Sequence, residues 1–150
     1  MTMWANLFYT NPDWIETLIR ITLGVVFFAH GAQKLLGWFG GPGYKETMRT
    51  MHQFLGVPSP LAFLAIATEF FGGAALIVGL FSRVAALGIA VTMVVAIFTV
   101  HLQFGLFANW SGTQKGEGFE FHLLVLAITT FLMIRGGGAF SVDRALAGRR

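Results

Sequence analysis

Eight polar side chains able to hold protons or hydrogen bonds interrupt an otherwise apolar sequence. They are Arg20, His30, Gln33, Lys34, Glu69, His101, Glu120 and His122. Histidine, lysine and glutamine can donate to a carbonyl oxygen, and a carboxylate can accept a proton. Placing an ionisable group at the centre of a bilayer costs about 2.5 to 3.5 kcal/mol. We therefore expect these side chains to face protein or a wet cavity.

The densest group lies in one apolar run, residues 20–34. At about 100° per residue, Arg20, Phe27 and Lys34 fall on nearly one stripe of a helix, with His30 one turn before Lys34. This stripe is expected to pack against the rest of the chain.

The composition indicates an integral membrane protein. Hydrophobic residues make up 55% of the 150 residues and charged residues 11%, against about a quarter charged in soluble domains. The net charge of +3 is attributed to membrane topology, because no basic face carries interleaved aromatics as nucleic-acid binding requires. The chain has no cysteine, which excludes thiolate catalysis and Cys-ligated clusters.

The hydrophobic pattern predicts an all-α protein, a transmembrane four-helix bundle that forms a single domain over residues 1–150. A short amphipathic surface helix is predicted at about 44–55, between the first two spans. Trp4, Trp14 and Trp38 suit interfacial belts. The spans are predicted at about residues 14–36, 60–80, 84–102 and 119–134.

The distribution of arginine and lysine predicts that both termini are cytoplasmic. In that arrangement five positive residues lie inside and three outside, which agrees with the positive-inside rule. The inside set is Arg83, Arg135, Arg144, Arg149 and Arg150, and the outside set is Lys45, Arg49 and Lys115.

Alternating spans bring the scattered polar residues to one level. We expect a pocket that opens toward the outer face and has Glu69 as its floor, with only Arg20 on the inner side. No basic residue lies within a helical turn of Glu69 in sequence, so it must pair with Lys34, Arg20 or a histidine across the bundle, or stay protonated.

Simpler interpretations remain open for several of these residues. Arg20 can pair with Glu16 at the inner helix end. Lys34 can extend toward the headgroups, and His101 and His122 can be ordinary interfacial histidines.

Among ligands, no metal is expected, because no helix carries an H-x-x-x-H or E-x-x-H pair. Glu120 and His122, two residues apart, lie on different helix faces. Haem ligation lacks a spacing motif. A quinone or similar small amphipathic molecule fits better, since histidine or lysine can bind its oxygens and phenylalanine can line the ring.

The ordered motifs resemble those of the DoxX-like membrane proteins, which are related to the DoxD subunit of thiosulfate:quinone oxidoreductase. The resemblance covers about residues 15–146. The matching positions are Arg20, Gly24, Phe28, Gly31, Lys34 and Leu35 in the first span, Glu69, Gly72, Gly73, Leu76, Gly79, Leu80 and Arg83 around the second, and Glu120, Ser141, Val142 and Asp143 near the end. Of the candidate site residues, Arg20, Lys34, Glu69 and Glu120 match the family pattern.

The resemblance implies a multi-pass protein of a bacterial cytoplasmic (inner) membrane, in contact with lipid. It implies an oxidoreductase subunit that binds a quinone or similar molecule in the outer pocket. The alternative is a non-catalytic anchor or scaffold for soluble redox enzymes. The sequence assigns no catalytic residue and leaves the electron donor open, and its glycine-rich faces would also suit a homo-oligomer.

Overall fold

The computed structural model describes residues 7–148, and within that range the chain forms helices and loops with no strand. The all-α prediction is confirmed over this part of the protein. Trp4, Arg149 and Arg150 lie outside the described residues.

The first long helix, α2, runs over Trp14–Leu36. Asp13 caps its start by accepting a hydrogen bond from the Ile15 backbone N–H at 2.8 Å. Gly37 ends it in the left-handed conformation, with φ of 75°, which a glycine adopts without strain.

The remaining long segments are built from shorter helices in sequence. A turn of 3-10 helix, η1, and two short helices, α3 and η2, follow α2; a second segment contains α4, η3 and α5; a third contains α6, η4 and η5; and α7 and α8 end the described chain. Their bounds are η1 Trp38–Gly40, α3 Gly43–Arg49, η2 Thr50–Phe54, α4 Ser59–Ala67, η3 Thr68–Gly72, α5 Gly73–Val78, α6 Ser82–Ala96, η4 Ile97–His101, η5 Leu102–Phe104, α7 Glu120–Arg135 and α8 Val142–Ala147.

Among residues 7–148, three continuous helical segments are long and apolar enough to cross a membrane. They are Trp14–Leu36, Ser59–Val78 and Ser82–Phe104. The fourth predicted span corresponds to α7, which has 16 residues and is shorter than the roughly 20 that a bilayer core requires.

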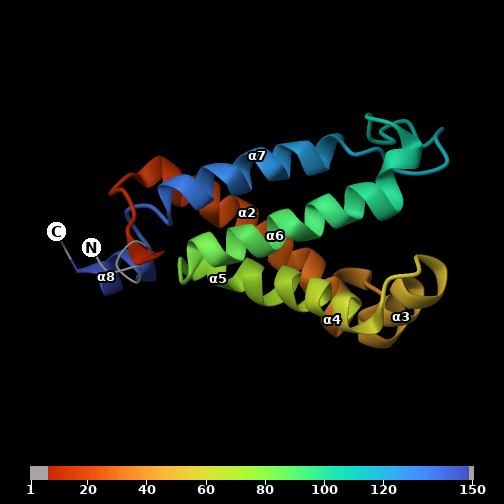
Figure 1. Cartoon of the computed structure of the whole chain (residues 1–150), viewed down its shortest axis with the longest axis horizontal. Helices are drawn as coiled ribbons and strands as arrows, with labels where there is room; N and C mark the ends of the chain where they lie inside the picture. The colour runs from red at the N-terminus through yellow and green to blue at the C-terminus, as the bar shows by residue number, and fades with distance from the viewer. Residues whose placement is uncertain (1–6, 149–150) are drawn as a thin grey trace.

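The helices form two pairs. α2 packs along α5 and η3, and α6 packs along α7. Figure 1 shows both pairs running along the long axis of the molecule, with the end near α3 and residues 105–119 splayed and the end near α8 closed.

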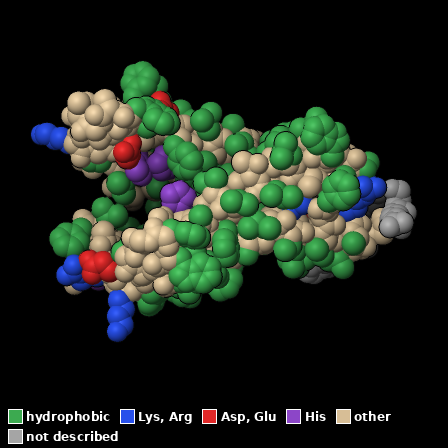
Figure 2. Space-filling model, turned by 180° about the vertical axis from the view of Figure 1, so that it is seen from behind, with side chains coloured by type: hydrophobic (Ala, Val, Ile, Leu, Met, Phe, Trp, Pro, Cys, Tyr) green, Lys and Arg blue, Asp and Glu red, His purple; other side chains and the backbone are tan. Residues whose placement is uncertain are grey.

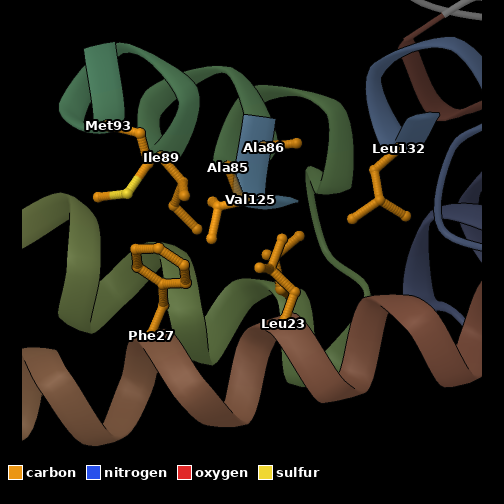
Figure 3. Packing of buried hydrophobic residues seen from close by; sticks show 9 residues of the cluster. Leu23, Phe27, Ala85, Ala86, Ile89, Met93, Val125 and Leu132 are labelled. Atoms are coloured by element: carbon orange, nitrogen blue, oxygen red, sulfur yellow. The ribbon is translucent and has the colours of Figure 1, made fainter. Parts of the chain in front are cut away.

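A shared core joins the two pairs (Figure 3). Leu23 and Phe27 of α2 face Ala86, Ile89 and Met93 of α6, and Val125 and Leu132 of α7 join the same buried cluster; all seven are at most 5% exposed. The outward faces of the long helices carry exposed leucine, valine and phenylalanine, as expected of surfaces that contact lipid.

Two glycines set the close approach of α2 to the second segment. A Cβ added at Gly31 would overlap the Phe70 backbone, and one added at Gly73 would overlap the Phe28 backbone. Small residues allow helix backbones to approach in this way.

Polar side chains close the end of the molecule near α8. Asp143, at the start of α8, accepts hydrogen bonds from the Phe81 and Ser82 backbone N–H groups at 2.7 and 2.8 Å. Arg83 donates to the carbonyls of Met133, Ile134 and Tyr9. These contacts join the start of α6 to α7, to α8 and to the segment before α2 at the end of the molecule near α8.

Candidate functional site

Lys34 and Glu69 form a partly buried ion pair between α2 and η3. The Lys34 Nζ atom lies 2.6 Å from Glu69 Oε1; the lysine side chain is 36% exposed and the glutamate side chain 5%. The second carboxylate oxygen, Oε2, is buried without a hydrogen-bond partner. Of the partners expected for Glu69, the structure therefore gives Lys34, and the lysine does not extend freely toward the headgroups.

Two of the candidate residues lie in π-helical turns. η3 contains Glu69 and η4 contains His101. Such turns are rare, occur as single wide turns within α-helices and are frequent at functional sites. The extra residue in each turn changes the direction of every side chain that follows, so it helps to set where Glu69 and His101 point.

On the other helix pair, the rings of His101 and His122 lie against each other in a tilted arrangement. Their ring centroids are 4.1 Å apart and the rings are tilted by 45°. His101 Nδ1 lies 2.8 Å from the Glu117 backbone oxygen. His122 is 7% exposed and its Nδ1 is buried without a partner.

His30 and Gln33 lie on the neighbouring side of α2. They line a hollow of about 370 Å³ with Val25, Val26, Ala29 and Phe39. Val26 packs against the core shared with α6 and α7. His30, four residues later, continues that side of α2 by one turn, toward the splayed end.

The splayed end of the molecule carries a cleft between two lobes. Figure 2 shows the surface hollowed between two lobes, with histidine side chains gathered around the hollow. The Lys34–Glu69 ion pair and the contact between His101 and His122 lie on different helix pairs, and the hollow that His30 and Gln33 line combines these polar side chains with apolar surface.

Two candidates lie outside this group. Glu120 accepts a hydrogen bond from the Trp110 indole N–H at 2.8 Å and thereby ties the 105–119 loop to the start of α7. Arg20 is fully buried toward the closed end. It donates to four backbone carbonyls, those of Leu76, Ile77, Gly137 and Phe140.

The alternative in which Arg20 pairs with Glu16 is wrong. Glu16 is 2.7 Å from Arg135 of α7. Three partners were missed by sequence reasoning: the Glu117 carbonyl at His101, Trp110 at Glu120, and Phe39 in the hollow beside His30. A backbone carbonyl carries no sequence signal. Of these three partners, only Trp110 could have been noticed in the sequence, because it is a large aromatic residue in a polar loop among glycines.

Among residues 7–148, no three histidine, aspartate or glutamate side chains lie close enough to hold a metal ion.

Comparison with known proteins identifies a matching family and several relatives. A family model described as DoxX matches residues 15–102. The Bacillus subtilis protein named "Putative oxidoreductase CatD" is 30% identical over 84% of this chain and 82% of its own. The Escherichia coli "Inner membrane protein YqjF" is 33% identical over 85% and 88%. The Mycobacterium tuberculosis "Uncharacterized membrane protein Rv3486" is 28% identical over 97% and 90%. No solved structure matches the chain.

Proposed function

Because the chain belongs to the DoxX family of membrane proteins, we propose that it is an oxidoreductase subunit that binds a quinone or similar small molecule in the cleft between its helix pairs. In this proposal Lys34, Glu69, His101 and His122 line the cleft. The observation that carries it is the Lys34–Glu69 pair, which holds a buried charge between α2 and η3. A membrane protein keeps such a pair at a cost of several kcal/mol per ion unless the partners compensate it. Ligand binding is a physical reason to keep it.

The donor groups fit the carbonyl oxygens of a quinone. Lys34 uses one N–H on Glu69 and has two more to donate. His122, across the cleft, can present a ring N–H, and phenylalanine side chains supply apolar surface for the ring. Since the chain has no cysteine, electrons must come from a bound molecule or a partner protein. One relative is named as an oxidoreductase, which agrees with a redox role.

We also propose that α7 is a fourth span, in a bacterial inner membrane with both termini cytoplasmic. Its 16 residues extend about 24 Å at 1.5 Å per residue, somewhat less than the hydrocarbon core, and a bilayer can thin locally around a short helix. In this orientation α3 and η2 lie on the outer membrane surface. The pairing of α7 with α6 along their lengths supports this placement.

The test is direct binding by the full-length protein in detergent or nanodiscs. We expect quinone to copurify, detectable by mass spectrometry, and added duroquinone to bind. Lys34→Ala should weaken duroquinone binding by about tenfold, the value of one charge-assisted hydrogen bond. Glu69→Gln should change the affinity too, because it removes the charge that holds Lys34 in place. The matched control is Glu46→Gln, which removes a carboxylate from the exposed Arg49–Glu46 pair. Unchanged affinity in both cleft variants would contradict the proposal.

A scaffold for soluble redox enzymes is the second candidate. Large aromatic residues are exposed at the splayed end, with Trp110 89% and Phe107 67% exposed, and a protein partner would cover such side chains. A pull-down distinguishes the two functions. A scaffold keeps its partners when Lys34 is replaced and loses them when Trp110 and Phe107 become serine.

A further inference from the structure

We infer that the cleft binds the reduced, dihydroxy form of a quinone in preference to the oxidised, dicarbonyl form. This inference rests on the proposed function and adds to it the redox state of the ligand. It follows from counting which polar atoms around the cleft can donate a hydrogen bond and which can only accept one.

On the side formed by α2 and η3, the Lys34 ammonium is a hydrogen-bond donor and the Glu69 carboxylate an acceptor. The short contact to Lys34 shows an ionised Glu69 carboxylate, which has no proton to donate. Its Oε2 is closed off without a partner. The Lys34 side chain, which is 36% exposed, can turn to admit a ligand hydroxyl to this atom while its own N–H groups donate to the ligand.

On the opposite wall, the geometry fixes the tautomer of His101. Its Nδ1 is 2.8 Å from the Glu117 backbone oxygen, which can only accept, so Nδ1 carries the proton. The neutral ring then offers Nε2 as an acceptor. His122 has an unpartnered Nδ1 and, as a neutral imidazole, can present either an N–H or a lone pair.

The count favours hydroxyl groups. An oxidised quinone has only acceptor oxygens and leaves Glu69 Oε2 and His101 Nε2 unsatisfied, and a buried acceptor without a partner destabilises a complex. A quinol has two O–H groups that donate to these atoms and two oxygens that accept from Lys34 and His122. A quinol is also uncharged, as suits a cleft whose charges are already paired.

The experiment compares the two redox forms on the same protein. Duroquinone and anaerobically reduced duroquinol are titrated into the full-length chain in nanodiscs, with tryptophan fluorescence as the readout. We expect the quinol to bind about tenfold more tightly, as one additional satisfied hydrogen bond gives. A tenfold preference raises the midpoint potential of the bound two-electron couple by about 30 mV, which redox titration measures independently.

Two variants test the groups that create the preference. Glu69→Gln adds an N–H donor in place of an acceptor, so the ratio of quinol to quinone affinity should fall toward one. His101→Phe removes an acceptor and keeps a ring beside His122, and it should lower the same ratio. It also carries the test if Glu69→Gln does not fold. The matched control is His52→Phe, because His52 also lies in a π-helical turn with its Nδ1 3.1 Å from a backbone oxygen, that of Val57; its ratio should stay at the wild-type value.

The outcomes separate this inference from the proposed function. If both forms bind equally and the variants leave the ratio unchanged, the preference for quinol is wrong and the cleft remains a quinone site. If neither form binds the wild-type protein, both the proposed function and this inference are wrong.

Discussion

Arg20 joins three segments of the chain through one side chain. Its guanidinium donates from α2 to the last turn of α5 and to the loop at residues 137–140. Lysine has one donor atom and cannot reach carbonyls spread over both segments. Each buried acceptor left unpaired costs about 1–3 kcal/mol. We therefore expect Arg20→Lys to lower the free energy of unfolding by about 3 kcal/mol, measured by thermal or denaturant unfolding in detergent.

The control for this prediction is Arg49→Lys. Arg49 is 55% exposed and pairs only with Glu46, three residues earlier, so lysine should keep the wild-type melting temperature. Equal melting temperatures for Arg20→Lys and Arg49→Lys would show that the carbonyl contacts contribute little.

The partners of the charged residues were predictable only where the partner also carries a charge. Glu69 could be assigned a partner across the bundle, because a carboxylate within an apolar segment requires one, and Lys34 was among those expected. Pairing with Glu16 was one open alternative for Arg20, but its acceptors are backbone carbonyls, which every residue has. The contact between the His101 and His122 rings depends on two helix ends meeting, which spacing in sequence does not encode.

At the level of elements, the approach of α2 to the second segment depends on glycine. Gly73→Ala places a Cβ into the Phe28 backbone, and the helices must separate to relieve it. Overpacking of this kind costs about 1–3 kcal/mol. We expect a lower melting temperature and a weaker Lys34–Glu69 contact, since the pair bridges the same two helices.

The neighbouring glycine provides the control. A Cβ at Gly72 meets no atom closer than 3.8 Å, and its φ of −66° is helical. Alanine there gains about 0.5–1 kcal/mol of helix propensity. Gly72→Ala should therefore keep or raise the melting temperature that Gly73→Ala lowers. A similar loss in both variants would indicate general sensitivity of the helix and not a close backbone contact.

The helices were predictable because each is a long apolar run bounded by glycine or proline. The π-helical turns at η3 and η4 were not, since one extra residue in a uniformly apolar helix leaves no mark in the hydrophobic pattern. The length of α7 was not misjudged, since the span predicted at 119–134 and the helix that forms there both contain 16 residues. Hydropathy alone does not decide whether so short a helix crosses a bilayer.

At the level of the whole molecule, the two ends differ in how the helix pairs are joined. Near α8, Arg20 of α2 binds the loop after α7 and Arg83 of α6 binds the Tyr9 carbonyl, so the helix pairs are joined there, while they diverge toward the other end (Figures 1 and 2). In the proposed function, the diverging end admits the ligand.

The proposed topology predicts which end faces which compartment, and the absence of cysteine allows a background-free test. Thr113 in the 105–119 loop and Ala145 in α8 are both exposed, and they lie on either side of α7. If α7 crosses the bilayer and arginine is retained inside, Thr113→Cys should react with a membrane-impermeant maleimide in intact spheroplasts, and Ala145→Cys only after lysis. Reaction of both from one side would show that α7 does not cross. The reverse pattern would keep four spans but place the cleft toward the cytoplasm, where its ligand would meet cytoplasmic electron donors.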